Sequence, residues 1–340
     1  MTFSILTDGS ALMDASEAEF KRAMNEGFGT RVRHFGSDLM CYSPTAYPYT
    51  IKDHRPSNRG NFVSFSVTGG ACALKCKHCG GRLLEGMEPA LTPDMLLRKC
   101  RALKEHGAEG VLVSGGSDSA GRVPLDQYAD AIRLIKNDLR LKVVVHTGLV
   151  NEFTARSLAD AQVDAAMLDV IGDERVAREV YNIQDGPEKT EAALRILEEQ
   201  GVPVVPHVLV GLNYGQTGGE LEALQIISRR KPAAVVLIVL NPVRKTAMEQ
   251  ISPPAPDVVG RIMTVARLGL ESTPILLGCA RPMGEHKVKS DILAVKCGVN
   301  GIAYISQKGV DTARTMGLKP IFRDVCCSLA YQDLLSAESS

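Results

Sequence analysis

Residues 62–81 read FVSFSVTGGACALKCKHCGG, a short β-branched and aromatic run that leads into a loop with three cysteines. The composition of the run predicts a strand followed at once by the loop. Cys72, Cys76 and Cys79 are separated by three and then two residues. Three thiolates on one loop are able to bind three corner irons of a cubane cluster, which leaves the fourth iron without a protein ligand.

Similar runs recur along the chain with helical patterns between them, which is typical of βα units around a parallel sheet. Eight such repeats in about 250 residues have the size of a (β/α)8 barrel of the TIM type, an α/β fold whose functional residues follow the strands. A doubly wound sheet is the alternative, but no GxGxxG turn follows the first strand. The expected strands are Phe62–Thr68, Gly110–Val113, Lys142–His146, Ala165–Val170, Val204–Val210, Ala233–Leu240, Pro274–Leu277 and Gly301–Ile305.

The ends of the chain do not fit the repeat. We expect a lead-in over residues 1–58 that contains a helix at Ser16–Gly27, the barrel over residues 59–310, and a tail over residues 311–340. The lead-in is otherwise expected to be irregular and extended, because prolines recur in it.

Composition excludes several classes of protein. Apolar residues make up 45% of the 340, and the 39 basic and 39 acidic side chains cancel. That balance gives no indication of a nucleic-acid or anionic-membrane partner and leaves only a local basic patch open. No basic residue precedes Lys21, and the longest apolar stretch, Pro232–Leu240, is far shorter than the roughly 20 residues that span a bilayer. We expect a soluble, cytoplasmic protein.

A structural zinc site is the alternative for the cysteine loop, with His78 or a distant cysteine as the fourth ligand. Such zinc sites require four protein ligands in a closed arrangement. We favour the cluster, because a structural zinc does not need a loop at the catalytic end of a barrel strand.

The loop resembles that of the radical S-adenosylmethionine (SAM) enzymes, whose signature is this cysteine spacing after the first barrel strand. The resemblance implies that the three cysteines bind a [4Fe-4S] cluster whose open iron is chelated by the amino and carboxylate groups of SAM. One electron then cleaves SAM to methionine and a 5'-deoxyadenosyl radical, which abstracts hydrogen from an unactivated carbon. The position before the third cysteine is usually aromatic in this family and is His78 here.

Further stretches resemble the SAM-binding parts of that family. Residues 114–117 read SGGS and match its Gly-rich turn, where glycine allows a close backbone approach. The end of the fourth strand matches a ribose contact, and the end of the fifth matches the segment along the adenine. Each stretch alone also fits an ordinary turn or a solvated strand end. The candidate SAM contacts are His78, Ser114, Gly115, Gly116, Asp169, Val210 and Gly211.

The downstream half resembles biotin synthase at Leu277–Arg281 and Cys297–Tyr304. In biotin synthase an arginine after the seventh strand binds a second, sulfur-donating cluster, and Arg281 is the matching position. Biotin synthase also places cysteines on inner strands, where the corresponding stretches Val143–His146 and Val204–His207 have none. We therefore do not expect a biotin synthase proper.

Residues 34–87 and Gly278–Pro282 resemble one subunit of the two-component lipoyl synthases, sulfurtransferases of lipoate biosynthesis that insert sulfur into an octanoyl chain. The implied partners are a second radical SAM subunit, an octanoylated lipoyl domain or glycine cleavage H protein, and an external electron donor. One alternative is a radical SAM enzyme without sulfur insertion, such as a mutase or an organometallic cofactor maturase. Another is an iron–sulfur or zinc module that binds a partner without chemistry.

Sulfur insertion requires a sulfur source, which the resemblance implies is an auxiliary iron–sulfur cluster with soft ligands outside the first motif. The candidate ligands are Cys41, Cys279, Cys326 and Cys327, with Arg281 in reserve. Each of these cysteines also fits a small buried hydrophobe, as Cys100 and Cys297 do on apolar helical positions. His146 and His207 end inner strands and either line the substrate cavity or form a hydrogen-bonded layer in the core.

We predict that replacing Cys72, Cys76 or Cys79 with alanine abolishes reductive cleavage of SAM, because a cluster that lacks one thiolate is not held with its open iron in place. Chromatographic measurement of 5'-deoxyadenosine tests this. Undiminished product from Cys76→Ala would refute the assignment.

Overall fold

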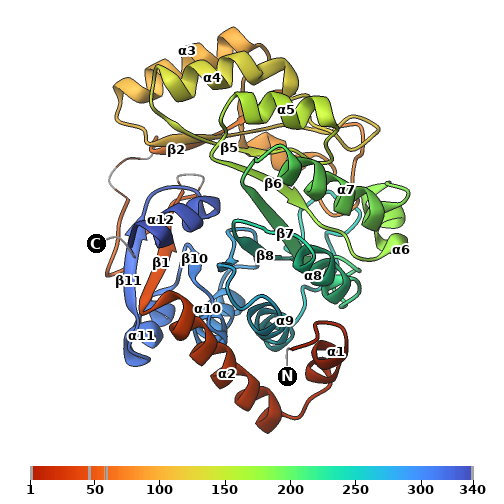
Figure 1. Ribbon diagram of the computed structural model, residues 1–340, viewed down its shortest axis with the longest axis vertical. Helices are drawn as coiled ribbons and strands as arrows, with labels where there is room; N and C mark the ends of the chain where they lie inside the picture. Colours follow the sequence, from red (N-terminus) through yellow and green to blue (C-terminus); the bar gives the residue numbers. More distant parts are fainter. Residues whose placement is uncertain (1–2, 45–46, 57, 59, 338–340) are drawn as a thin grey trace.

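The computed structural model describes residues 3–44, 47–56, 58 and 60–337. Within them, eleven parallel strands form one sheet in the order β11, β1, β10, β9, β8, β7, β6, β5, β4, β2, β3. The sheet curls into a partial barrel with helices around its outside (Figure 1). The strands are β1 (Asp38–Tyr42), β2 (Phe62–Ser66), β3 (Glu88–Pro89), β4 (Gly110–Ser114), β5 (Lys142–His146), β6 (Ala165–Asp169), β7 (Val204–Val210), β8 (Val235–Val239), β9 (Ile275–Leu277), β10 (Gly301–Ala303) and β11 (Lys319–Arg323).

The eight predicted strands are confirmed as β2 and β4 to β10, and the α/β barrel class with them. Three strands were not predicted. β1 lies in the lead-in and β11 in the tail, and β1 pairs with β10 on one side and with β11 on the other. The lead-in and the tail thus extend the sheet. The boundaries after residues 58 and 310 stay predictions, and residue 59 lies outside the described part of the chain.

Most helices follow strands, and some begin at residues whose side chains cap them. Ser16 and Glu19 form a capping box at the start of α2, and the Thr92 side chain accepts from Met95 N at the start of α3. The helices are α1 (Thr7–Met13), α2 (Glu17–Phe35), α3 (Pro93–Glu105), α4 (Ala129–Asn137), α5 (Glu152–Asp160), α6 (Glu174–Val176), α7 (Gly186–Glu199), α8 (Glu220–Ser228), α9 (Pro256–Gly269), α10 (Glu285–Cys297), α11 (Gln307–Thr315) and α12 (Ala330–Ala337). Among the described residues, none of these helices is long and apolar enough to cross a membrane.

Alternate residues of the strands divide the core in two, because successive side chains point to opposite faces of a sheet. Val143 and Val145 of β5 pack with helix residues such as Leu158, whereas Val144 packs with inward residues of the other strands. The second cluster contains Met167 of β6 but no residue of α3 to α11. It therefore marks the inside of the barrel, which we call the lumen.

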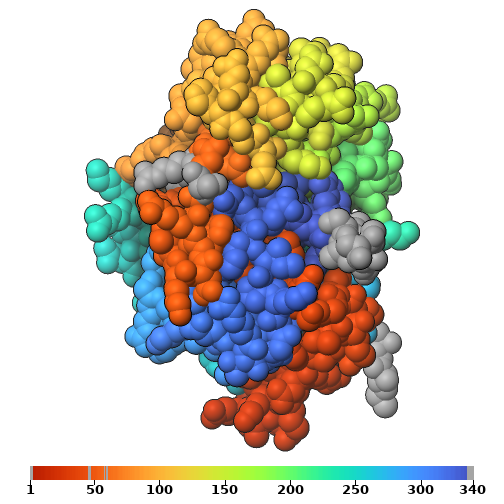
Figure 2. Space-filling view, turned by 90° about the vertical axis from the view of Figure 1, so that its left-hand side faces the viewer, coloured from red at the N-terminus to blue at the C-terminus, as the bar shows by residue number. Residues whose placement is uncertain are grey.

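The C-terminal tail fills one end of the lumen. After β11 the chain forms a short turn, η4 (Cys327–Leu329), and then α12, beside β1 inside the curve of the sheet (Figure 1). Leu329 and Leu334 belong to the inner core, and Tyr42 Oη donates to Asp333 Oδ2 at 2.9 Å. Figure 2 shows the blue C-terminal residues packed between the red-orange lead-in and the orange and yellow residues of α3 and α4. The tail thus covers the side where the sheet is open.

We predict that Leu329→Ala lowers the free energy of unfolding by about 2–5 kcal/mol, because it leaves a cavity in the inner core. Leu329 is 3% exposed. Leu83→Ala is the matched control: Leu83 is 57% exposed, so we expect a change within about 0.5 kcal/mol. Chemical denaturation measures both, and equal effects would contradict the packing of the tail.

Candidate active site

The cysteine loop, residues 69–81, leaves the C-terminal end of β2 and is held by its neighbours through backbone hydrogen bonds. Ala73 N donates to Ser117 O at 2.8 Å, and Lys77 N donates to Val180 O at 2.8 Å. The two acceptors belong to the segments that follow β4 and β6. The loop therefore takes its shape from the ends of two other strands.

The contact after β6 comes from a π-helical turn, η3 (Ala177–Tyr181), which ends at Asn182 in a left-handed conformation. Asn182 Nδ2 donates to Leu74 O at 2.7 Å, and Tyr181 O lies 3.8 Å from Cys76 Sγ. π-turns are rare and are frequently found at functional sites. Sequence reasoning missed this segment, since only the asparagine at its end hints at a special backbone conformation.

The side chains of the loop form a metal-ligating group. Among the described residues, Cys76, His78 and Cys79 are the one group of three or more whose ligand atoms all lie within 4.8 Å of one another. A hydrogen bond from the Cys76 thiol lowers the pKa of Cys79 to about 4 and raises the pKa of Cys76. Cys72 is half-buried on the same loop, and its charge adds to the rise at Cys76. The donors are soft and suit iron or zinc.

The Gly-rich turn after β4 packs directly on this loop. Gly116 N donates to Thr68 Oγ1 at 2.7 Å. A Cβ at Gly116 would lie 1.9 Å from Ala71 O and 2.6 Å from Cys72 Cβ. The resemblance to radical SAM enzymes implied that this position is glycine because bound SAM lies close to its backbone. The structure gives a nearer reason, because the cysteine loop itself occupies the space.

Comparisons with known proteins agree with this site. Residues 66–224 match the sequence model described as the Radical SAM superfamily. The match includes the cysteine loop, the Gly-rich turn and η3. This segment of the chain belongs to the radical SAM superfamily.

Individual relatives are distant. A biotin synthase of Leptospira biflexa is 23% identical over 264 residues, which cover 74% of this chain and 72% of the relative. A 7,8-didemethyl-8-hydroxy-5-deazariboflavin synthase of Halobacterium salinarum is 23% identical over 252 residues, 69% and 66% of the two chains. The structure of methylornithine synthase aligns over 98% of this chain and 97% of its own, with a TM-score of 0.65 and 17% identity. That of the hydrogenase maturase HydG covers 98% and 75%, with a TM-score of 0.68 and 15% identity. The two structures support the fold alone.

Membership in the superfamily makes a [4Fe-4S] cluster and SAM the cofactors of this radical SAM enzyme. The thiols of Cys76 and Cys79 are close enough together for such a cluster, and Cys72 lies on the same loop outside that close group. Cys72, Cys76 and Cys79 would hold it, since three thiols from one loop leave one iron open for SAM. His78 Nδ1 is buried without a hydrogen-bond partner, and the His78 ring lies 4.9 Å from the Tyr181 ring.

Asp169 lies between the residues that contact the cysteine loop and those that line the lumen. Tyr181 Oη donates to Asp169 Oδ2 at 2.7 Å, and His146 Nε2 lies 3.7 Å from Asp169 Oδ1. Burial opposes ionisation of Asp169, but the imidazoles of His146 and His207 and the Tyr181 hydroxyl hold its pKa well below the usual range. Asp169 is thus an ionised acceptor at the end of β6, as a ribose contact would require.

The other candidate SAM contacts lie in different parts of the barrel. Ser114 Oγ donates to His146 O at 3.0 Å inside the barrel mouth. The Val210 side chain packs in the outer core, away from the lumen. Gly211 adopts a φ of 84°, and a Cβ there would lie 2.6 Å from Pro254 Cδ, so packing already explains this glycine. Gly115 lies between Ser114 and Gly116 in the turn.

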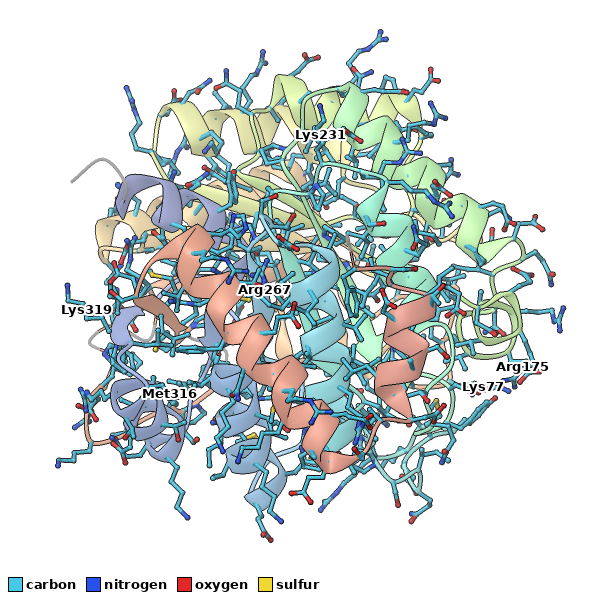
Figure 3. The ribbon with its side chains drawn as sticks, turned by 60° about the horizontal axis from the view of Figure 1, so that its bottom comes forward. Lys77, Arg175, Lys231, Arg267, Met316 and Lys319 are labelled. Atoms are coloured by element: carbon cyan, nitrogen blue, oxygen red, sulfur yellow. The ribbon has the colours of Figure 1, made fainter. Side chains whose placement is uncertain are left out.

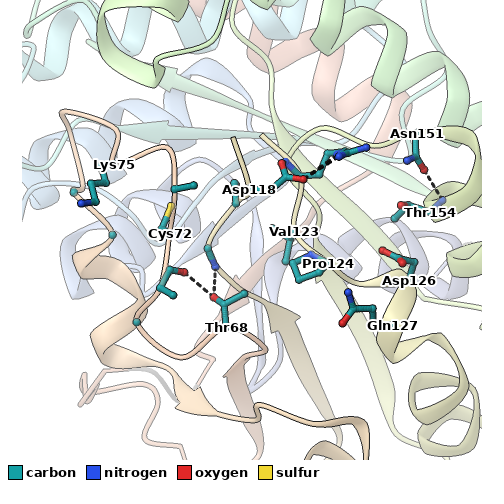
Figure 4. A pocket seen from close by; sticks show the side chains of 18 of the residues that line it. Thr68, Cys72, Lys75, Asp118, Val123, Pro124, Asp126, Gln127, Asn151 and Thr154 are labelled. Atoms are coloured by element: carbon teal, nitrogen blue, oxygen red, sulfur yellow. Dashed lines mark hydrogen bonds and ion pairs between the residues drawn. The ribbon is translucent and has the colours of Figure 1, made fainter. Parts of the chain in front are cut away.

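A groove with a volume of about 780 Å³ borders the cysteine loop. It is lined by Cys72 and Gly116 and by the segments that follow β4 and β5, as Figure 4 shows for Asp118, Asn151 and Thr154. Of the candidate SAM contacts, only Gly116 lines it.

Two of the predicted auxiliary ligands have surroundings other than the lumen, and their role as ligands stays a prediction. Cys41 points into the outer core, where burial raises the pKa of its thiol to about 12. Arg281 is 2% exposed and donates through Nη2 to Asp291 Oδ1 at 2.8 Å and to Ala303 O at 2.6 Å. Its remaining Nη1 donates to Gly278 O. Arg281 therefore fixes the ends of β9 and β10 rather than facing the lumen.

The other three cysteines interact electrostatically, but among the described residues their sulfur atoms do not form a group that lies within 4.8 Å. Cys279 is exposed to solvent. Desolvation by the neighbouring protein atoms, together with the charge of Cys326, raises the pKa of its thiol. A hydrogen bond from Cys327 lowers the pKa of Cys326 to about 7. Cys327 is buried in the inner core, and the charge of Cys279 contributes to the raised pKa of its thiol. By contrast, Cys100 and Cys297 are buried in the outer core, as their apolar helical positions predicted.

We predict that Gly116→Ala destabilises the protein by about 1–3 kcal/mol, because a methyl group there overlaps the backbone of the cysteine loop. It should also lower the yield of 5'-deoxyadenosine. Gly70→Ala is the matched control: it lies in the same loop, and a Cβ there meets nothing within 4 Å. Thermal unfolding and product measurement compare the two. Equal behaviour would show that the turn and the loop do not pack as described.

Proposed function

We propose that this radical SAM enzyme inserts sulfur at an unactivated carbon, and that it does so on a protein-bound octanoyl chain as one subunit of a two-component lipoyl synthase. The observation that carries the proposal is the placement of three further cysteines: Cys327 belongs to the inner core, Cys326 packs against that core, and Cys279 follows the end of β9 by two residues. The similarity to a biotin synthase adds support, because biotin contains sulfur.

The lumen suits the chemistry. When bound, the radical cluster supplies the electron that cleaves SAM, and the resulting 5'-deoxyadenosyl radical takes a hydrogen atom from the substrate. Inner residues such as Met167, Val205 and Val236 form an apolar floor that would bury an alkyl chain away from water. Asp169 and His146 lie at the strand ends above this floor, next to the cysteine loop.

The proposal includes three partners: the second radical SAM subunit, an octanoylated lipoyl domain or H protein, and an external electron donor. For the donor, the surface beside the cysteine loop offers basic side chains. Lys77 Nζ donates to Tyr214 Oη at 2.9 Å and Arg175 Nη2 to Asn213 Oδ1 at 2.9 Å, and Figure 3 shows both side chains at one edge of the molecule. This charge favours an acidic donor.

A radical SAM enzyme without sulfur insertion is the second candidate. It is favoured by one observation: Cys326 Sγ already lies 2.8 Å from Ser328 Oγ, so the tail cysteines have partners without any cluster. Under this reading Cys279 is a solvent-exposed thiol without a metal.

Iron content separates the two candidates. We predict more than four irons per chain after anaerobic reconstitution, since one cubane cluster accounts for only about four. The double variant Cys279→Ser/Cys326→Ser should fall to about four, retain 5'-deoxyadenosine formation, and lose sulfur transfer to an octanoylated lipoyl domain in the presence of the partner subunit. The measurements are the iron and sulfide content of each protein and the mass of the lipoyl domain, which reports sulfur transfer.

Cys41→Ala is the matched control, because it removes a buried thiol from the other face of the sheet. We expect it to keep its full iron content. Four irons in the unaltered protein, with no sulfur transfer, would favour the second candidate.

A further inference from the structure

Tyr181 is the last residue of η3, the π-helical turn that contacts the cysteine loop. It is 7% exposed and belongs to the same core cluster as Leu74 and Cys76 of the loop. Its carbonyl oxygen lies 3.8 Å from Cys76 Sγ. The centroid of its ring lies 4.9 Å from that of the His78 ring. The backbone and the ring of Tyr181 therefore both support the loop that carries the three thiols.

The hydroxyl group of Tyr181 contacts the end of a strand instead. Tyr181 Oη donates to Asp169 Oδ2 at 2.7 Å, and Asp169 is the last residue of β6. The other carboxylate oxygen, Oδ1, lies 3.7 Å from His146 Nε2, which is longer than a normal hydrogen bond. The phenol is therefore the closer of these two polar partners of the carboxylate. A buried tyrosine usually finds a hydrogen-bond partner for its hydroxyl group, and here that partner is charged.

The sheet fixes the backbone of Asp169. Its strand pairs with β5 on one side and with β7 on the other, and Asp169 itself lies opposite His207 of β7. Rotation of the Asp169 side chain is the freedom that remains, and the hydrogen bond from Tyr181 selects one orientation. Because Tyr181 also packs against the cysteine loop, this orientation is set relative to the thiols.

We infer that Tyr181 is a positioning residue for the cleavage of SAM, and that its hydroxyl group orients the Asp169 carboxylate relative to the cysteine loop. Asp169 is the ribose contact that the resemblance to radical SAM enzymes implies. A ligand that binds to the loop's cluster and to Asp169 requires the two at a fixed separation, and Tyr181 contacts both. The inference goes beyond the proposed function, because it applies with or without sulfur insertion.

Tyr181→Phe tests the hydroxyl group alone, since it keeps the ring beside His78 and the backbone beside Cys76. The full-length protein is reconstituted anaerobically with iron and sulfide. We expect SAM binding, measured by equilibrium dialysis, to weaken about tenfold, as is typical when a residue that orients a ligating group is removed. The KM for SAM should rise by the same factor. Iron content and the EPR spectrum of the reduced protein without SAM should not change.

Tyr331→Phe is the matched control. Tyr331 Oη donates to Asp164 O, directly before the other end of β6, so this variant also loses one tyrosine hydrogen bond to the same strand region. We expect its affinity for SAM to stay unchanged. The double variant Tyr181→Phe/Asp169→Ala should bind SAM no more weakly than Asp169→Ala alone, because the hydroxyl group acts through the carboxylate.

Three results would overturn the inference. The first is unchanged SAM affinity in Tyr181→Phe. The second is a further loss of affinity in the double variant, because the hydroxyl group would then act by a route other than Asp169. The third is lost iron or an altered EPR spectrum in Tyr181→Phe, which would place the defect in the cysteine loop itself. Sulfur transfer to an octanoylated lipoyl domain tests the proposed function separately, and its absence would leave the SAM affinities of these variants as expected.

Discussion

The cysteine loop depends on contacts that it cannot make by itself. It is a stretch of turns between β2 and η1 (Arg82–Gly86), and the backbone bonds of Ala73 and Lys77 to other loops give it a fixed path. Gly116 lies so close to it that no side chain fits between them. Because both supports follow strands of the same sheet, the strand register determines where the three thiols lie. The barrel is thus the means by which a short flexible loop becomes a defined metal site.

The polar residues of the lumen form one connected layer. Tyr181 contacts the His78 ring and donates to Asp169, and Asp169 in turn faces His146. Buried polar groups of this kind are costly unless each has a partner. The ionised carboxylate of Asp169 is stabilised by a phenol on the cluster side and by an imidazole on the tail side. Burial lowers the pKa of His207 to about 4, so this second imidazole is neutral near neutral pH. One carboxylate therefore influences both ends of the lumen.

The sequence predicted the fold and the radical cluster better than the rest of the site, for physical reasons. Strands such as Val235–Val239 are buried on both faces, and that burial is visible as a continuous apolar run. Three cysteines within eight residues must be neighbours in space whatever the fold. By contrast, the distance from Cys279 to Cys326 depends on the path of the tail after β11, and nothing local specifies that path. The ion pair of Arg281 was not predictable for the same reason, since its buried partner Asp291 lies on α10.

The tail has a consequence for how the two halves of the molecule depend on each other. Asn61, before β2, donates to Asp324 O at 2.9 Å, and Asp324 Oδ1 lies 2.7 Å from His54 Nε2 of the lead-in. The first strand of the barrel, the lead-in and the tail therefore meet at one point beside the open edge of the sheet. Cys326 follows this point by two residues. A change at Asp324 would move the Cys326 thiol while β2 keeps its pairing with β4, on which the position of the cysteine loop depends, so the two groups of cysteines are able to vary independently on one barrel.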